Sequence, residues 1–378
     1  MSPIYLIADS IASPLGLGTA WHWQRLEKGD SAISLVSRED IVLKDFHAAS
    51  ISPLLWEEWR SAFSLSLDLS RLETLMLTTL RDAALQCPVD FSSSKTLLVF
   101  STTKGNIDTL SSQSASQGTL MSLASRVASE LGNPNVPLVV SNACISGLSA
   151  LLIAQSLLRS GKYEHAVVCG GDLLSEFTVS GFQCLHAISP FPCTPFDQGR
   201  MGLSPGEACG TLVLSRTRPT STDTVITLAG GASSNDANHI SGPSRTGDGL
   251  ALAISKALKI AKLSAKDISY TCTHGTATLY NDESESKALA LAGINMAPAN
   301  SLKGYFGHTY GAAGVIETIL TAQSMKKSQI LGSLGYKQHG VSTVMDISAN
   351  TRKHAIAHSL KTASGFGSCN AALILSAA

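Results

Sequence analysis

The sequence predicts an α/β protein that consists of two similar halves, one after the other along the chain. Strand-like and helix-like segments alternate in the first half, and a ten-residue pattern from that half returns near the C-terminus. The chain has 378 residues, which is more than the ~250–300 that a single hydrophobic core usually covers. Two compact halves, or one large layered domain, would account for this length.

The alternation is clearest between residues 96 and 169. Short apolar runs at 96–100, 137–140 and 165–169 predict buried strands. From 147 to 160 apolar residues recur at steps of three and four, and Ser160 with Gly161 would close a helix there. Strand, helix and strand in succession are typical of an α/β sheet.

The repeated pattern relates residues 206–215 to residues 367–376. One Gly, two Leu and one Ser recur at a constant offset of 161 residues, which suggests that both halves end on equivalent strands. A polar segment with one proline, 216–224, follows the first copy. We therefore expect an N-terminal half at 1–215, a connection at 216–222 and a C-terminal half at 223–378.

Composition argues against several classes of function. Hydrophobic residues make up 44% of the chain and aromatic residues 6%, so aliphatic side chains must fill most of the core. Basic and acidic residues both number 28, without a basic cluster, which gives nucleic-acid binding little electrostatic basis. The apolar run 4–8 ends at Asp9, so we expect a cytoplasmic protein with no signal peptide and no membrane span. Eight cysteines without a CxxC pair predict reduced thiols and no zinc site.

A cysteine lies where a predicted strand turns into the predicted helix. Cys144 stands in the segment Ser-Asn-Ala-Cys-Ile-Ser-Gly at 141–147. A helix N-terminus carries partial positive charge and free N–H groups, so we expect it to stabilise a thiolate and to lower the pKa of the thiol. The small neighbours Ala143, Ser146 and Gly147 would leave room for a thioester carbonyl. A buried structural thiol is the alternative interpretation.

This segment resembles the Ala-Cys-x-(Ser/Thr)-Gly elbow of the elongating β-ketoacyl-acyl-carrier-protein synthases, whose cysteine accepts the acyl group. Residues 274–278, His-Gly-Thr-Ala-Thr, resemble the family's His-Gly-Thr-x-Thr motif. Asp282 and Glu285 occupy its downstream Asp-x-x-Glu pair. Residues 303–314 resemble the Lys-x-x-x-Gly-His-x-x-Gly-Ala-Ala-Gly block, which contributes Lys303 and His308.

The resemblance implies that Cys144 is the nucleophile and that His274 and His308 are its catalytic partners. Such a condensation needs a thiol that accepts an acyl group and a carbanion made by decarboxylating malonate. Two imidazoles that present Nε2–H to the malonyl thioester oxygen would stabilise the enolate. A Cys-His-Asn set would indicate the initiating type, and a second cysteine acting as base would indicate a thiolase.

Further residues are expected to support the two histidines. A lysine beside a buried histidine needs a carboxylate partner, and for Lys303 the resemblance nominates Glu285. The pair is expected to orient the site. The motif also implies supporting roles for Asp282, Thr276 and Thr278.

Residues 363–370 resemble the family's Gly-Phe-Gly loop, with Phe366 between Gly365 and Gly367. Phe366 would lie over the acyl pocket, and its backbone N–H would form an oxyanion hole with that of Cys144. Glycines on both sides would let the backbone approach the ligand closely, although a glycine-rich strand turn is the plainer alternative. The chain departs from the family pattern at 8–10, Met201 and 368–369, and it is short for the family.

Over nearly the whole chain, the resemblance implies a thiolase-like fold with its halves stacked as α-β-α-β-α layers and the active site where they meet. It implies a decarboxylative Claisen condensation of an acyl thioester with malonyl-acyl-carrier protein. No metal or organic cofactor is expected, and the expected partners are an acyl carrier protein and a second copy of the chain. The alternatives are a specialised polyketide or aryl-polyene condensing enzyme with an unusual starter, and a non-catalytic partner subunit of a heterodimer.

Overall fold

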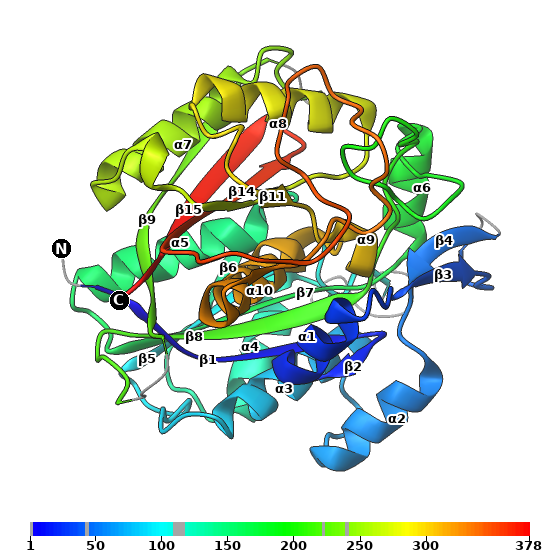
Figure 1. The fold of residues 1–378 in the computed structure, drawn as a ribbon. Coiled ribbons are helices and arrows are strands. Elements are labelled where there is room, and N and C mark those ends of the chain that lie inside the picture. The colour runs from blue at the N-terminus through cyan, green and yellow to red at the C-terminus, as the bar shows by residue number, and fades with distance from the viewer. Residues whose placement is uncertain (1–2, 42–44, 109–117, 221–223, 239–241) are drawn as a thin grey trace.

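The computed structural model describes residues 3–41, 45–108, 118–220, 224–238 and 242–378. A mixed sheet of eleven strands runs through the whole molecule (Figure 1). In order across the sheet its strands are β6 (Leu138–Val140), β5 (Thr96–Ser101), β7 (His165–Asp172), β8 (Ala208–Ser215), β1 (Tyr5–Ser13), β9 (Ile226–Asn235), β15 (Cys369–Ala377), β14 (His358–Gly365), β10 (Tyr270–Cys272) and β11 (Ala299–Asn300), and β2 (Gly16–Leu17) pairs with β1.

The two ends of this sheet repeat one topology. β5 is parallel to β6 and β7, and β8 is antiparallel to β7 and β1. In the same way β10 is parallel to β11 and β14, and β15 is antiparallel to β14 and β9. β8 and β15, which carry the repeated ten-residue pattern, are therefore equivalent strands. The prediction of two similar halves is confirmed, whereas their boundaries at 215 and 223 stay a prediction, and the connection at 216–222 extends beyond the described residues.

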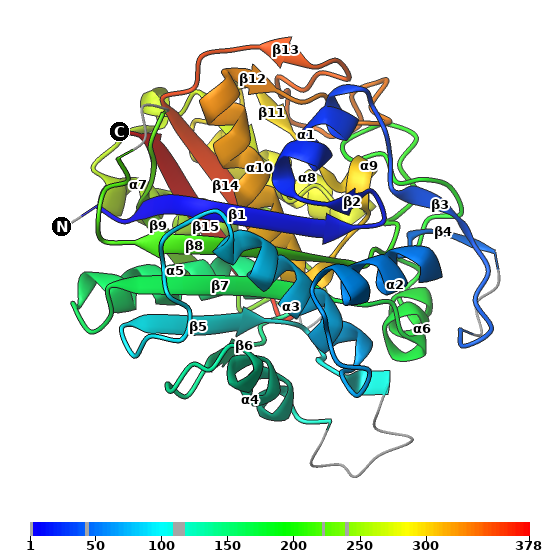
Figure 2. The same cartoon turned by 90° about the horizontal axis from the view of Figure 1, so that it is seen from below.

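Six helices of the described residues form three layers around the two halves of the sheet, as Figures 1 and 2 show. On one outer face α3 packs on β1, β7 and β8 and α4 on β6, and on the opposite face α7 packs on β9 and β15 with α8 beside it. Between them α5 and α10 touch strands of both halves. The α-β-α-β-α arrangement is therefore confirmed. These helices are α3 (Arg71–Ala84), α4 (Leu120–Glu130), α5 (Ser146–Arg159), α7 (Asp248–Ala261), α8 (Leu279–Leu291) and α10 (Ala313–Lys327).

The remaining elements are short and lie around this frame. They are α1 (Thr19–Glu27), α2 (Pro53–Ala62), α6 (Glu176–Cys184), α9 (Lys303–Phe306), the 3-10 helices η2 (Ala265–Asp267) and η3 (Tyr310–Ala312), the pair β3 (Ile33–Val36) and β4 (Phe46–Ala49), and the pair β12 (Gln329–Ile330) and β13 (Arg352–Lys353). Within the described ranges, no helix is both long enough and apolar enough to cross a membrane.

The elements predicted around the cysteine are confirmed. The three expected strands are β5, β6 and β7, and the expected helix is α5, which buries Leu148, Leu151 and Leu158. The strand predicted at 137–140 is present, but the prediction that it is buried is wrong, because β6 lies at the end of the sheet and is only half-buried. Nearly all of α10 is buried, since it lies in the middle layer between the two halves of the sheet. All eight cysteines are free thiols, as expected.

Candidate active site

A tight turn between β6 and α5 positions Cys144. Ala143 has a φ of 45°, a left-handed conformation that is costly for a residue with a Cβ. The turn is fixed by the hydroxyl of Ser146, which accepts a hydrogen bond from the N–H of Asn142 at 2.8 Å and donates one to the carbonyl of Ala143 at 2.6 Å. Cys144 therefore lies just before the first turn of α5, with a side chain only 8% exposed.

Burial controls the acidity of this thiol. Desolvation raises the pKa of Cys144 to about 12, and the positive charge of Lys303 opposes the rise. The expectation that the helix N-terminus lowers this pKa is wrong for the free site. The reason is that the thiol is buried and precedes the N-cap residue Ile145, so it does not lie within the first helical turn. The neutral thiol is the resting form, and its proton must leave as it attacks a substrate.

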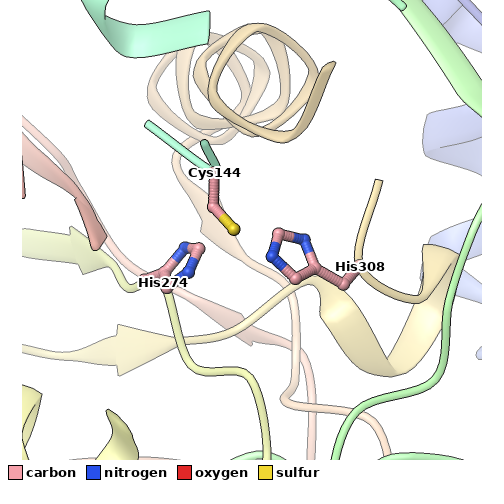
Figure 3. A group of neighbouring side chains, drawn as sticks. All are labelled: Cys144, His274 and His308. Atoms are coloured by element: carbon pink, nitrogen blue, oxygen red, sulfur yellow. The ribbon is translucent and has the colours of Figure 1, made fainter. Parts of the chain in front are cut away.

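The structure brings Cys144, His274 and His308 together from both halves of the chain (Figure 3). The thiol sulfur and one nitrogen of each ring all lie within 4.8 Å of one another. The two imidazoles are edge to face, with centroids 5.3 Å apart, and both are buried. Above them opens a cavity of about 430 Å³, whose lining includes Phe182, Met201, Leu279 and Phe366.

Hydrogen bonding fixes the tautomer of His308. Its Nδ1 accepts a hydrogen bond from the backbone N–H of Tyr310 at 3.2 Å, so in the neutral ring the proton is on Nε2. Burial, and then the charges of Lys303, Lys104 and Lys361, hold the pKa of His308 well below its usual range. Nε2 is buried and has no hydrogen-bond partner among the described residues. A buried donor without a partner is costly, and a substrate oxygen would satisfy it.

Lys303 fixes the tautomer of His274, which like His308 carries its proton on Nε2. Its ammonium group, which can only donate, lies 3.3 Å from Nδ1 of His274 and 2.6 Å from the carbonyl oxygen of that residue. Burial, followed by the charges of Lys303, His308 and Lys361, lowers the pKa of His274 well below its usual range. Both rings therefore keep their proton on Nε2. A metal ion would need a free nitrogen lone pair on each ring, but Nε2 carries the proton and Nδ1 accepts a hydrogen bond. The arrangement therefore suits hydrogen-bond donation and not metal binding.

The prediction that Lys303 pairs with Glu285 is wrong. Nζ of Lys303 lies 2.7 Å from Oε1 of Glu317 on α10, and the second carboxylate oxygen of Glu317 lies 2.7 Å from Nζ of Lys361 on β14. Glu285 on α8 instead accepts hydrogen bonds from the backbone N–H groups of His274 and Gly275, both at 2.8 Å. Its oxygens are thus used to hold the histidine loop.

Asp282 supports the same loop from α8. Its carboxylate accepts hydrogen bonds from the N–H of Thr276 at 2.9 Å and of Phe196 at 2.7 Å. Burial raises the pKa of Asp282 to about 6. The hydroxyls of Thr276 and Thr278 lie 2.9 Å apart at the end of the loop, and both residues line the cavity. The supporting residues predicted from the motif therefore lie around His274.

The glycine-rich loop after β14 touches the cysteine turn. A Cβ on Gly365 would lie 3.0 Å from the backbone nitrogen of Cys144 and 3.3 Å from the Cβ of Ala143, so the close approach favours glycine. Gly367 has a φ of 83°. Phe366 is 39% exposed, lines the cavity and stacks on Phe182 with ring centroids 5.4 Å apart. The close approach of this loop to the cysteine turn is what an oxyanion hole formed by the backbone N–H groups of Cys144 and Phe366 would need.

Three residues around the site were missed by sequence reasoning. The signal available for Glu317 was a single acidic residue in the middle of the largely apolar helix α10, whereas the polar sequence of β14 gave no signal for Lys361. Phe182 lies in a helix with no motif of its own.

Comparison with known proteins identifies the class. A model of the N-terminal domain of β-ketoacyl synthases matches residues 88–219, and a model of the C-terminal domain matches residues 225–337. The chain is 30% identical to the tetracenomycin polyketide synthase ketoacyl synthase alpha subunit of Streptomyces glaucescens, over 67% of this chain and 63% of that protein. It is 31% identical to a 3-oxoacyl-(acyl-carrier-protein) synthase homolog of Saccharomyces cerevisiae, over 62% of this chain and 57% of that protein.

Solved structures agree with this class. A chain of the Xenorhabdus doucetiae structure described as the ketosynthase ApeO in complex with its chain length factor ApeC is 25% identical, with a TM-score of 0.86. That match covers 100% of this chain and 98% of the other. The chain therefore belongs to the β-ketoacyl synthase family. Its aligned part spans less than two thirds of the two curated relatives, 63% and 57% of their lengths.

Proposed function

We propose that the protein catalyses the decarboxylative Claisen condensation of an acyl thioester with malonyl-acyl-carrier protein to give 3-oxoacyl-acyl-carrier protein. The observation that carries this proposal is the pair of neutral imidazoles beside the thiol of Cys144, whose Nδ1 atoms are both occupied as acceptors. Two Nε2–H donors at one point can hold a single oxyanion. No step of this reaction requires a metal or an organic cofactor.

In the first step the acyl group moves to Cys144. The sulfur attacks the thioester carbonyl, a new C–S bond forms, and the bond to the sulfur of the carrier breaks. The proton of the thiol passes to the departing carrier thiolate, as a buried thiol with a raised pKa requires. The backbone N–H groups of Cys144 and Phe366 are proposed to receive the oxyanion of the tetrahedral intermediate.

In the second step the malonyl thioester loses carbon dioxide. The electron pair of the broken C–C bond moves into an enolate, whose oxygen accepts hydrogen bonds from Nε2–H of His274 and His308. The α-carbon then attacks the acyl thioester on Cys144, a C–C bond forms, and the C–S bond breaks, after which the cysteine thiolate takes up a proton from water. Neutral imidazoles suit this role because they donate hydrogen bonds without first having to lose or gain a proton.

The proposal is tested with a panel of acyl-carrier thioesters. Intact-protein mass spectrometry should show one acyl group added at Cys144, and a malonyl-carrier thioester should then release carbon dioxide and yield a 3-oxoacyl product. The preferred acyl group would be read directly from the added mass. A protein that acquires no acyl group from any of these thioesters and releases no carbon dioxide would contradict the proposal.

A specialised condensing enzyme that uses an unusual starter is the second candidate. It is favoured by the identity to a polyketide synthase subunit and by the likeness to a ketosynthase solved with a chain length factor. The exposed Met201 on the cavity lining, where the family pattern has Asp, would also alter substrate contacts. A non-catalytic partner subunit is less consistent with a chain that keeps Cys144, His274, His308 and Lys303 together.

Partners are proposed on the same basis. An acyl carrier protein would deliver both thioesters, and the chain would form a homodimer in the cytoplasm. In support, β6 ends the sheet with one backbone edge that no other described strand pairs, and such an edge can add a strand from a second copy. A heterodimer with a related subunit is the alternative, and size-exclusion chromatography with light scattering on the purified chain would distinguish the two.

A further inference from the structure

The structure holds a second lysine that the proposed mechanism does not use. Lys361 lies on β14 with an exposed fraction of 0%. Its Nζ donates to the carbonyl oxygens of Thr273 at 3.0 Å and Thr362 at 2.7 Å, and it lies 2.7 Å from Oε2 of Glu317. Burying a charged lysine is costly unless its charge is paired, so these contacts are needed to hold Lys361 in the core.

Lys361 completes a chain of contacts that ends on a catalytic imidazole. One oxygen of Glu317 holds Lys361 and the other holds Lys303, both at 2.7 Å. Lys303 in turn lies 3.3 Å from Nδ1 of His274. With Glu285, which accepts a hydrogen bond from the hydroxyl of Thr362, the cluster contains two lysines and two glutamates and is electrically balanced.

We propose that Lys361 is a positioning residue that, through Glu317 and Lys303, keeps the imidazole proton of His274 on Nε2. The carboxylate of Glu317 has two oxygens, and a single lysine would leave one of them free to rotate toward other donors. Lys361 forms an ion pair with that second oxygen at 2.7 Å, which leaves the first oxygen at Lys303 and Lys303 at Nδ1 of His274. The effect on catalysis rests on the proposed function, but the position of the proton does not.

Other charges also face His274, and the test must separate them from Lys361. They come from every element packed around the ring: Cys144 before α5, Glu285 and Asp282 on α8, Lys303 on α9, His308 before η3, Glu317 on α10, and Lys361 on β14. Among these, Lys361 touches neither the ring nor the cavity lining in the contacts described. Its contacts therefore reach the ring only through the intervening groups, while its charge also lowers the pKa of His274 from a distance.

The first measurement is the tautomer of His274 by ¹⁵N NMR of the full chain, with its signals assigned by their loss in His274→Asn. In the native protein at pH 7 we expect a proton-free Nδ1 and a protonated Nε2. In Lys361→Met we expect a mixture of tautomers or a protonated ring, whereas Lys353→Met, at an exposed lysine on β13, should leave the signals unchanged. Unchanged His274 signals in folded Lys361→Met would overturn the proposal.

The second measurement compares Lys361→Met/Glu317→Gln with Glu317→Gln alone, and it also covers the case in which Lys361→Met does not fold. The double variant loses one charge of each sign, so the cluster stays balanced. If Lys361 acts through Glu317, both proteins should show the same tautomer of His274. A tautomer that differs between them would show direct action of Lys361 and would contradict the proposal.

The third measurement is the pH profile of malonyl decarboxylation. Loss of one positive charge favours a protonated His274, so the acid limb of the profile should move to higher pH in Lys361→Met, by roughly one unit. A general weakening of the fold would lower the rate at all pH values without moving the limb, and that result would count against a positioning role. If the native protein shows no decarboxylation, the proposed function fails, while the NMR measurements still decide the role of Lys361.

Discussion

Nζ of Lys303 lies 2.7 Å from Oε1 of Glu317, so the lysine beside His274 is paired with a carboxylate from the middle helical layer. Both side chains are buried, with exposed fractions of 1% and 5%. The ion pair connects α9, which carries Lys303, to α10. Because α10 contacts both halves of the sheet, the pair ties this part of the C-terminal half to the interface between the halves. The pairing of Lys303 with Glu317 can be tested by measuring the energetic coupling between the two side chains.

Glu317→Gln should lower the free energy of unfolding by about 3–5 kcal/mol, because it leaves two buried lysines without their carboxylate. Lys303→Met should lower it by less, because Glu317 keeps its ion pair with Lys361. The double variant should lose much less than the sum of the two. Denaturant melts of the four proteins give the coupling energy. Lys303→Met combined with Glu285→Gln is the matched control, and its effects should be close to additive. Coupling to Glu285 that exceeds coupling to Glu317 would refute the pairing.

Cys144→Ala should abolish acyl transfer and condensation while the melting temperature stays close to that of the native protein, because only a thiol can accept the acyl group. Cys184→Ala is the control, since Cys184 is an exposed free thiol on α6. It should leave both activities unchanged. Mass spectrometry after incubation with an acyl-carrier thioester reads the result, and an acyl group still attached to the Cys144→Ala protein would disprove the assignment.

Much of the fold and the core of the site followed from local patterns in the sequence. The alternating strands and helix around Cys144 depend on short-range periodicity, and the repeated pattern at 206–215 and 367–376 marked equivalent strands. His274 and His308 stand in motifs of several residues each. Such signals lie within a few residues of one another, so sequence reasoning can detect them.

The errors have a common physical cause, since they concern what surrounds a residue in three dimensions. Whether Lys303 meets Glu285 or Glu317 depends on how α8 and α10 stack against the loop at 273–276, which no local pattern encodes. The pKa of Cys144 depends on burial by the opposite half of the chain, and desolvation outweighs the helix N-terminus that the sequence did reveal. Lys361 was missed because its strand contains several other polar residues, so only its burial in three dimensions distinguishes it.

His274→Ala and His308→Ala should separate the two half-reactions. Each removes one hydrogen-bond donor to the enolate oxygen, so malonyl decarboxylation should fall by roughly 10²–10³. Acylation of Cys144 should fall much less, because its oxyanion is proposed to be held by backbone N–H groups instead. Release of labelled carbon dioxide and covalent acylation are measured separately on each variant. Equal loss of both activities in a folded protein would mean that the histidines activate the thiol instead.

Gly365→Ala should slow acylation of Cys144 at least tenfold. The added Cβ would meet the backbone nitrogen of Cys144 at 3.0 Å, so the cysteine turn has to move and the proposed oxyanion hole is displaced. The cost in stability should be about 1–3 kcal/mol, as is usual for overpacking. Gly181→Ala on α6 is the control, because no atom lies within 4 Å of its added Cβ. Native acylation kinetics in Gly365→Ala would show that this contact does not position the nucleophile.

The last prediction concerns His22, a buried histidine far along the chain from the catalytic motifs. Its Nδ1 donates to the carbonyl of Gly18 at 2.8 Å, and its Nε2 lies 2.7 Å from the hydroxyl of Ser13, which therefore donates to the neutral ring. Protonation would break the second bond and bury a charge. Burial accordingly lowers the pKa of His22 from 6.5 to about 4.

The sign of the resulting pH dependence follows from proton binding. Above pH 6.5 the ring is neutral in both the folded and the unfolded chain, so it contributes no pH dependence. Between pH 6.5 and 4 only the unfolded chain takes up the proton, so the folded state loses stability as the pH falls. At pH 5 this loss should be about 2 kcal/mol, and it should be absent from His22→Gln. Carboxyl groups such as Asp282 titrate in both proteins and cancel in the comparison. Urea melts of both proteins at pH 7 and pH 5 measure this difference. The free energy of unfolding of the native protein should exceed that of His22→Gln by about 2 kcal/mol less at pH 5 than at pH 7. A difference between the two proteins that is the same at both pH values would show that His22 is not held neutral by its surroundings.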